Sequence, residues 1–325
     1  MSKPLLDIQA IRTAATRIED KIVHTPLLEA ELLNEQLGGR VLFKPECLQH
    51  TGAFKFRGAL NKLSSLTPEQ YRQGVVAYSS GNHAQGVAAA AKALGINAKI
   101  IIPKDAPALK IANTRAYGAE VILYDRYTES REEIGLAIAK REQRALVPPY
   151  DDLDIMAGQG TVGLEIAEAL QAMGVQADAV LCPCGGGGLI SGVSTAIRAL
   201  SPGTDVFAVE PEGFEDTHRS LLSGEREINA TQGGSICDAI VTPQPGELTF
   251  AVNRETLTAG LVVSDQVVIE AMRETFTHLK LVVEPGGVVG LAALLAGKYD
   301  VRGKTVVVVL SGGNMDLAAF LKFQG

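Results

Sequence analysis

Long apolar runs and clusters of basic residues are both missing from this sequence. No apolar stretch is long enough for a membrane-spanning helix, and residues 1–21 alternate charged with apolar residues, unlike a signal peptide. The 30 Lys and Arg residues are scattered and are outnumbered by 37 Asp and Glu, giving a formal net charge of −7. This balance argues against a nucleic-acid partner. We therefore expect a cytoplasmic protein that binds neither membranes nor nucleic acids.

Cysteine is also scarce, with only four residues in the chain. Cys182 and Cys184 are separated by a single proline, whereas common zinc knuckles leave a two-residue gap between their cysteines. The other two, Cys47 and Cys237, lie far from this pair and from each other. We interpret all four as buried free thiols.

The pattern of apolar residues predicts an α/β fold. Short β-branched runs alternate with longer stretches of helical apolar spacing, which is typical of a parallel sheet with crossover helices. An apolar content of 46% is ample for a core. Predicted strands cover residues 40–45, 75–79, 98–103, 120–124, 179–183, 205–210 and 304–310, and predicted helices cover residues 86–95, 107–118 and 129–144.

Two domains are expected because 325 residues exceed the roughly 100 to 200 residues of a typical single domain. Residues 75–147 hold several consecutive strand and helix units, so we predict that they form a small inserted domain. Residues 1–74 and 148–325 would form the large domain. The prolines at 148 and 149 favour a return crossing between the two. The active site should lie in the cleft, at the carboxyl ends of strands.

Four consecutive glycines, Gly185, Gly186, Gly187 and Gly188, follow one predicted strand and precede a helical stretch. Such a loop brings bare backbone N–H groups to a helix N-terminus, where they can hold an anion. The alternative is a tight turn without a ligand, but one or two glycines normally suffice for a turn. The loop lacks both the GKS or GKT of a P-loop and the spacing of a dinucleotide fingerprint. A single phosphate group on a small cofactor is the ligand we infer.

Lys55 lies between Phe54 and Phe56, directly after a turn that contains glycine. Partial desolvation by the aromatic rings would lower the pKa of the amine and leave it suited to forming a Schiff base. Taken alone, the same pattern also fits a surface lysine whose stem passes the aromatic rings.

These motifs together resemble the fold-type II enzymes that depend on pyridoxal 5′-phosphate (PLP), in particular the threonine dehydratase and serine racemase branch. The resemblance covers almost the whole chain. It implies a tryptophan synthase β-like fold, with two parallel-rich twisted sheets, flanking helices and the cofactor in the cleft between domains. The stretches that carry it are GAFKFRGA (52–59), SSGNHAQG (79–86), AGQGT (157–161), GGGG (185–188), AVEPE (208–212), EPGG (284–287) and SGGN (311–314).

The resemblance implies roles for the cofactor-binding residues. Lys55 would be the Schiff-base lysine, Phe54 would pack against the ring, and Asn82 would bond its 3′-oxygen. The loop 185–188 would hold the phosphate. Ser311 would bond the pyridine nitrogen, and because a hydroxyl cannot strongly protonate that nitrogen, the ring would favour β-elimination over transamination. Without the other motifs, Ser311 would be interpreted as a serine that ends a strand in a Gly-rich turn.

The segment 79–83 would grip the substrate carboxylate through Ser79, Ser80, Gly81, Asn82 and His83. In racemases of the branch, the serine that matches Ser80 acts as acid or base on the cofactor face opposite the lysine. The alternative role of Ser80 is a helix cap. We interpret His83 as a hydrogen-bonding scaffold residue, because the lysine already serves as the base.

A divalent-cation site is also implied, with Glu210, Asp216 and the carbonyl of Phe214 as its ligands. Oxygen ligands suit Mg²⁺ or Ca²⁺. The alternative is that the two acids are ordinary loop residues.

The expected function is therefore that of a PLP-dependent ammonia-lyase of the threonine or serine dehydratase type. The freed Lys55 amine would take the α-proton, and loss of the β-hydroxyl would lead to a 2-keto acid and ammonia. L-Threonine would give 2-oxobutanoate and L-serine would give pyruvate. Serine racemase and 3-hydroxyaspartate dehydratase share every motif quoted and stay open as alternatives. A non-catalytic PLP-binding protein is disfavoured by the pairing of Lys55 with Ser80.

Two departures from the family pattern bear on specificity and control. The sequence has Cys237-Asp238-Ala239 where relatives usually have Asp-Gly, followed by residues 242–250, and this leaves the substrate open. The chain also ends soon after residue 314, so we expect no C-terminal regulatory domain and no feedback control through one. The expected partners are a small amino-acid substrate and a second copy in a homodimer.

Overall fold

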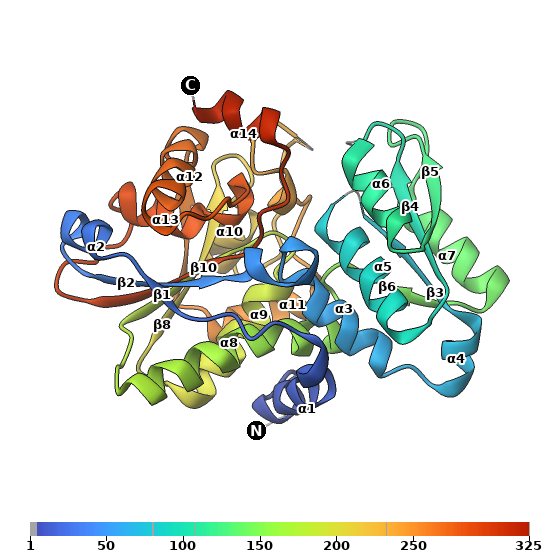
Figure 1. Cartoon of the computed structure of the whole chain (residues 1–325), viewed down its shortest axis with the longest axis horizontal. Coiled ribbons are helices and arrows are strands. Elements are labelled where there is room, and N and C mark those ends of the chain that lie inside the picture. The colour runs from blue at the N-terminus through green and yellow to red at the C-terminus, as the bar shows by residue number, and fades with distance from the viewer. Residues whose placement is uncertain (1–4, 80, 107, 232, 325) are drawn as a thin grey trace.

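The computed structural model describes residues 5–79, 81–106, 108–231 and 233–324. Two separate sheets organise the chain, as Figure 1 shows. The larger has six strands in the order β1-β2-β10-β7-β8-β9, and the smaller has four in the order β5-β4-β3-β6. Every described pairing between these strands is parallel except that of β1 with β2.

The strands of the six-stranded sheet are β1 (Leu28–Glu29), β2 (Arg40–Pro45), β7 (Ala179–Pro183), β8 (Asp205–Pro211), β9 (Ala259–Val263) and β10 (Thr305–Leu310). Those of the four-stranded sheet are β3 (Val75–Tyr78), β4 (Ala98–Pro103), β5 (Glu120–Tyr124) and β6 (Ala145–Val147). The helices are α1 (Ile8–Ile18), α2 (Glu31–Leu37), α3 (Lys55–Ser64), α4 (Pro68–Gln73), α5 (Asn82–Leu94), α6 (Ala108–Ala116), α7 (Arg131–Glu142), α8 (Leu153–Met173), α9 (Gly188–Leu200), α10 (Asp216–Ser223), α11 (Glu247–Thr256), α12 (Asp265–Leu279), α13 (Val289–Leu295) and α14 (Leu317–Gln324).

Helices cover both faces of the six-stranded sheet. On one face, α12 and α13 pack on the strands through residues such as Val268 and Leu291. On the other face, α8 and α9 pack through residues such as Val162 and Ile190. β10 reads TVVVVL and its last five residues are all buried, because a central parallel strand has no solvent-facing side. The α/β fold with two parallel-rich sheets and flanking helices is thus confirmed.

Most predicted elements agree with the structure, and the differences are local. The strands 40–45, 98–103, 120–124 and 179–183 are confirmed to the residue, whereas β1, β6 and β9 were not predicted. The helix predicted from residue 86 begins four residues earlier, at Asn82. The segment 79–83 is therefore partly helical, because the first turn of α5 starts directly after the bend at Gly81.

The second sheet takes all its strands from residues between Val75 and Val147. Its core also includes Phe56, Leu60 and Leu63 of α3, which lies between the two sheets in Figure 1. The domain boundaries proposed at 74/75 and 147/148 stay a prediction, because α3 precedes the boundary yet shares this core. Within the described ranges, no helix combines the length and the apolarity that crossing a membrane requires.

Candidate active site

Lys55 begins α3, and its position is set by the loop that precedes it. Thr51 and Gly52 have φ values of 61° and 70°, so the chain turns sharply there. The loop is then bound to the segment after β10: Phe54 N donates to Ser311 O at 3.1 Å, and Ala53 pairs with Gly312. These contacts bring Lys55 next to Ser311 although the two lie far apart in the chain.

The amine of Lys55 points into a cavity between the two sheets. Nζ donates to the carbonyl of Pro149 at 2.6 Å and lies 5.1 Å from the centre of the Phe54 ring. Desolvation lowers the pKa of Lys55 to about 8, although the side chain keeps some exposure toward the cavity. A larger fraction of this amine is therefore unprotonated at neutral pH than of an ordinary lysine, which makes it a better nucleophile.

The tetraglycine loop connects β7 to α9 on another wall of the same cavity. Gly187 has a φ of 93°, and a Cβ there would lie 2.8 Å from Asn253 Nδ2. A Cβ at Gly186 would lie 2.4 Å from the Tyr150 ring. Glycine is thus required at both positions, and the loop lines the cavity and leads directly into the N-terminus of α9. The loop fits a phosphate group.

Asn82 is held by two residues to which the sequence assigned no role. Its Nδ2 donates to Glu284 Oε1 at 2.6 Å, and its Oδ1 accepts from Asn314 Nδ2 at 2.8 Å. This fixes the orientation of the amide, whose second N–H can donate to a ligand oxygen. Burial raises the pKa of Glu284 to about 7. Glu284 belongs to the EPGG stretch and Asn314 to the SGGN stretch, and these two motifs are the sequence signal that could have indicated a role for them.

His83 is buried, and one nitrogen of its ring contacts the backbone. Its Nε2 lies 3.0 Å from the carbonyl of Val147, and because a carbonyl only accepts, Nε2 carries the hydrogen. Its Nδ1 is buried without a hydrogen-bond partner among the described residues. Burial and then the charge of Lys55 lower the pKa of His83 to about 3, so the ring is neutral at neutral pH.

Ser79, Gly81 and Ser311 also line the cavity, which encloses about 140 Å³. Ser79 Oγ accepts from Gly81 N at 3.2 Å, and Ser311 is buried at the end of β10. Ser80, the predicted acid or base of a racemase, lies outside the described residues.

Two cationic side chains that sequence reasoning missed, Lys110 and Arg131, line this cavity as well. Lys110 Nζ lies 4.0 Å from Asp238 Oδ2, and the Arg131 guanidinium stacks 5.7 Å from the centre of the Tyr78 ring. Both come from the second sheet's helices, α6 and α7. No local motif marks them, since only the tertiary fold brings α6 and α7 to the cleft.

The predicted cation ligands Glu210, Phe214 and Asp216 are all buried. Glu210 accepts from the backbone N–H groups of Thr217 and His218 at 2.9 and 2.8 Å. Burial and the neighbouring Asp216 raise the pKa of Glu210 well above its ordinary value.

Asp216 differs from Glu210 in that one of its oxygens lacks a partner. Oδ1 accepts from Asn229 Nδ2 at 2.6 Å, whereas Oδ2 is buried with no hydrogen bond to any described residue. Burial raises the pKa of Asp216 to about 7. This donor set suits a hard cation, but no group of three or more His, Cys, Asp or Glu side chains in the described ranges could hold a metal. The cation stays a prediction.

All four cysteines are free thiols, and Cys182, Cys184 and Cys237 are buried as expected. Cys47 differs, since it is only half-buried.

Comparison with known proteins identifies the family. A family described as pyridoxal-phosphate dependent enzymes matches residues 18–312. The chain belongs to this family. PLP is its cofactor, and the amine of Lys55, the glycine loop, Asn82 and Ser311 surround one cavity that fits it.

Three curated relatives in this family match most of the chain. The L-threo-3-hydroxyaspartate ammonia-lyase of Saccharomyces cerevisiae is 45% identical and covers 94% of this chain and 93% of its own. The serine racemase of Schizosaccharomyces pombe is 40% identical, with coverages of 96% and 95%. The catabolic L-threonine dehydratase of Escherichia coli K12 is 39% identical, with coverages of 98% and 96%.

Solved structures agree with this assignment. The threonine deaminase of T.th. is 44% identical and superposes with a TM-score of 0.90 over 96% of this chain and 99% of its own. Maize serine racemase is 37% identical, with a TM-score of 0.92 and coverages of 98% and 97%. These PLP-dependent relatives include both ammonia-lyases and racemases.

Proposed function

We propose that this protein is a PLP-dependent ammonia-lyase that removes water from a β-hydroxy amino acid and releases a 2-keto acid and ammonia. The observation that carries the proposal is that the Lys55 amine, with its pKa lowered to about 8, opens into the same cavity as the glycine loop and Ser311. Bound PLP supplies an electron sink for charge that develops at the substrate α-carbon.

The chain's own groups perform binding and proton transfer in this scheme. Lys55 takes the α-proton, and the carbonyl of Pro149 holds its amine at the cavity wall. The first turn of α5 binds the substrate carboxylate, and Asn82, fixed by Glu284 and Asn314, orients the cofactor ring. The hydroxyl of Ser311 leaves the ring a moderate electron sink, which supports elimination over transamination.

A substrate with a second carboxylate, such as 3-hydroxyaspartate, is favoured by the two cations of the cleft. Lys110 and Arg131 line the same cavity as Lys55. Lys110 lies 4.0 Å from the mostly exposed Asp238, and Arg131 binds the half-exposed Glu132 through Nε at 2.7 Å. A side-chain carboxylate would complement this positive wall. The hydroxyaspartate ammonia-lyase among the relatives supports the same substrate, whereas L-threonine and L-serine would leave the two cations without a partner from the substrate.

A substrate panel tests this proposal. L-threo-3-hydroxyaspartate, L-serine, L-threonine and D-serine would be supplied, and keto acid, ammonia and the opposite enantiomer would be measured. Arg131→Gln should raise KM for hydroxyaspartate about 10- to 100-fold, because a charge-assisted hydrogen bond contributes about 1.5–3 kcal/mol. It should leave KM for serine nearly unchanged. Arg141→Gln, on the exposed face of the same helix, is the matched control.

The outcomes separate the alternatives. An equal loss for both substrates would remove the second-carboxylate proposal. If the main product from L-serine is D-serine, the protein is a racemase, and Ser80→Ala should then abolish racemisation more completely than dehydration. No turnover with any member of the panel would overturn the enzymatic proposal.

A further inference from the structure

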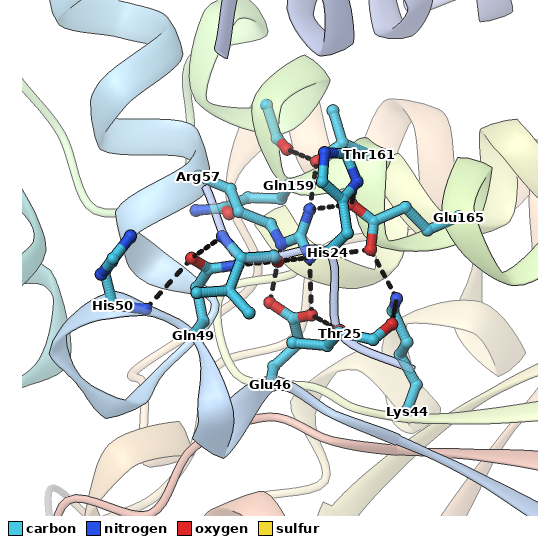
Figure 2. Close-up of polar contacts among 12 residues, drawn as sticks. His24, Thr25, Lys44, Glu46, Gln49, His50, Arg57, Gln159, Thr161 and Glu165 are labelled. Atoms are coloured by element: carbon cyan, nitrogen blue, oxygen red, sulfur yellow. Dashed lines mark hydrogen bonds and ion pairs between the residues drawn. The ribbon is translucent and has the colours of Figure 1, made fainter. Parts of the chain in front are cut away.

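Arg57 lies two residues after Lys55 in α3, and its side chain is completely buried, with 0% exposure. Its guanidinium donates two hydrogen bonds to each of two carboxylates, as Figure 2 shows. Nε and Nη2 donate to Glu46 at 2.7 and 2.9 Å, and Nη1 and Nη2 donate to Glu165 at 2.6 and 2.9 Å. Nη1 also donates to Thr161 Oγ1 at 3.2 Å.

A second cation completes this group. Lys44 Nζ donates to Glu165 Oε2 and to the carbonyl of Thr25, both at 2.5 Å. We call Lys44, Glu46, Arg57 and Glu165 the Arg57 cluster. The formal charges of the cluster cancel. Burial alone would lower the pKa of Arg57, but Glu46 and Glu165 keep it above its ordinary value. The cluster joins α3 to α8, to β2 and to the turn that follows β2.

Buried ion pairs add little net stability compared with apolar packing, because desolvating the charges costs about as much as their attraction returns. Their bonds are directional, however, and a displaced partner leaves a buried charge uncompensated. The Arg57 cluster therefore fixes geometry more than it stabilises the fold. What it fixes is the position of α3 along α8.

The same helix α8 also sets the position of the glycine loop. Where α3 meets α8, a Cβ on Gly158 would lie 2.7 Å from the Cα of Gly58. Where α9 meets α8, a Cβ on Gly192 would lie 2.4 Å from the backbone nitrogen of Gly160. Both crossings are thus backbone contacts with no room for adjustment by side chains. α9 begins at the last glycine of the 185–188 loop, so α8 connects Lys55 to that loop through two rigid contacts.

We propose that Arg57 is a positioning residue that fixes the distance between the Lys55 amine and the glycine loop, so that the two can hold one cofactor at the same time. The inference rests on the proposed function, in which Lys55 and the loop bind opposite ends of PLP. A ligand bound at two points gains affinity from the second only if their spacing matches the ligand. Displacing α3 should therefore reduce the affinity that the cofactor phosphate adds, although the loop that binds the phosphate stays unchanged.

The experiment compares PLP with pyridoxal, which lacks the phosphate, in wild type and in two variants. Arg57→Lys keeps the charge but loses the fork that binds two carboxylates at once. Glu165→Gln keeps the shape at a site with 13% exposure, and it decides the question if Arg57→Lys does not fold. Lys62→Met is the control, because Lys62 also joins α3 to the start of α8, through Asp152 and Asp154, but lies outside the Arg57 cluster.

We expect the ratio of the PLP and pyridoxal affinities, measured by cofactor absorbance, to fall at least about tenfold in both cluster variants. With PLP bound, kcat should fall up to about 100-fold while KM stays within about twofold, because a small misplacement affects proton transfer more than carboxylate binding. The isotope effect from deuterium at the substrate α-carbon should rise. Lys62→Met should match wild type in the affinity ratio, kcat, KM and the isotope effect.

Two results would overturn the inference or its foundation, and they differ. If the cluster variants melt at lower temperature yet keep the wild-type affinity ratio and isotope effect, Arg57 only stabilises the fold and the inference is wrong. If wild type itself binds no PLP and turns over no substrate, the proposed function fails instead.

Discussion

The chemistry of Lys55 depends on what surrounds a single amine. Burial lowers its pKa, the Pro149 carbonyl orients it, and the loop contacts with Ser311 and Gly312 place it at the cavity. Each of these contacts comes from a segment distant in the chain. In the proposed function, Lys55 acts as base and nucleophile only because folding brings these segments around its amine.

Lys55→Ala should remove both the yellow absorbance of bound PLP and all elimination activity, because no other described residue presents an amine beside Phe54. Absorbance spectra and keto-acid release check this. Lys62→Ala, on the same helix, should retain both. An active, yellow Lys55→Ala protein would refute the central assignment.

His83 offers a test of which ring nitrogen matters. Gln at this position can still donate to the Val147 carbonyl, whereas Asn places its amide near Nδ1 and cannot reach that carbonyl. If His83 is a scaffold, His83→Asn should lose about 1–3 kcal/mol of stability, the cost of leaving a buried acceptor without its bond. His83→Gln should lose less, and urea unfolding measures both. The opposite order would assign the function to Nδ1.

Glu284 predicts a pH dependence of stability. Its pKa is raised by burial from 4.5 to about 7, so between these values the folded state holds a proton that the unfolded state releases. Its contribution to stability is thus present below the unfolded pKa and is lost as pH rises through about 7. Glu284→Gln removes this loss.

The free energy of unfolding of Glu284→Gln minus that of wild type should therefore increase from about pH 5 to about pH 8. Urea unfolding across this range measures the difference, which cancels the contributions of Glu210 and Asp216. A difference that stays constant with pH would show that Glu284 is not buried with a raised pKa.

At the scale of elements, two buried carboxylates lie close together where β8 connects to α10. Glu210 is the second-last residue of β8 and Asp216 is the first residue of α10, and the repulsion between them raises the pKa of Glu210 further. A divalent cation would offset this repulsion. The unfolded chain offers no formed site, so binding would favour the folded state.

We predict that chelation by EDTA lowers the melting temperature and the activity, and that Mg²⁺ or Ca²⁺ restores both. A cation at 100 times its dissociation constant would add about 2.7 kcal/mol. Glu210→Ala should respond to neither ion. If EDTA-treated wild type keeps its melting temperature and turnover, and added cation changes neither, the two acids are ordinary structural residues.

At the scale of the whole molecule, two described helices carry exposed apolar side chains at neighbouring positions. Leu317 and Leu321 of α14 are 72% and 59% exposed, and Phe276 of α12 is 48% exposed and contacts Phe320. A second copy that covers these residues would remove them from water. This surface gives the predicted homodimer a place to form.

Light scattering should therefore give twice the 34.3 kDa mass of the chain. Leu317→Glu should shift the mass toward that of one chain, whereas Leu222→Glu, at an exposed leucine of α10, should not. A dimer that Leu317→Glu leaves intact would place the interface elsewhere, and a monomeric wild type would refute the dimer.

The sequence by itself determined the elements and the residue types of the site. Short runs of buried apolar residues specify parallel strands through local propensity and hydrophobic period, so strands such as β2, β4 and β7 are predicted to the residue. The glycine loop and Lys55 carry signals within a few residues, because a phosphate cradle needs consecutive bare N–H groups. The short strands β1, β6 and β9 lacked such a signal.

Only the tertiary structure decided which residues share the cavity and what holds them there. Lys110 and Arg131 lie on helices with no motif of their own, and they reach the cleft because the second sheet places α6 and α7 beside it. Arg57 is a candidate positioning residue because its guanidinium donates hydrogen bonds to Glu46 and Glu165, which lie 11 and 108 residues away in the chain. Contacts between segments distant in the chain arise from packing, and no local pattern in a single sequence records them.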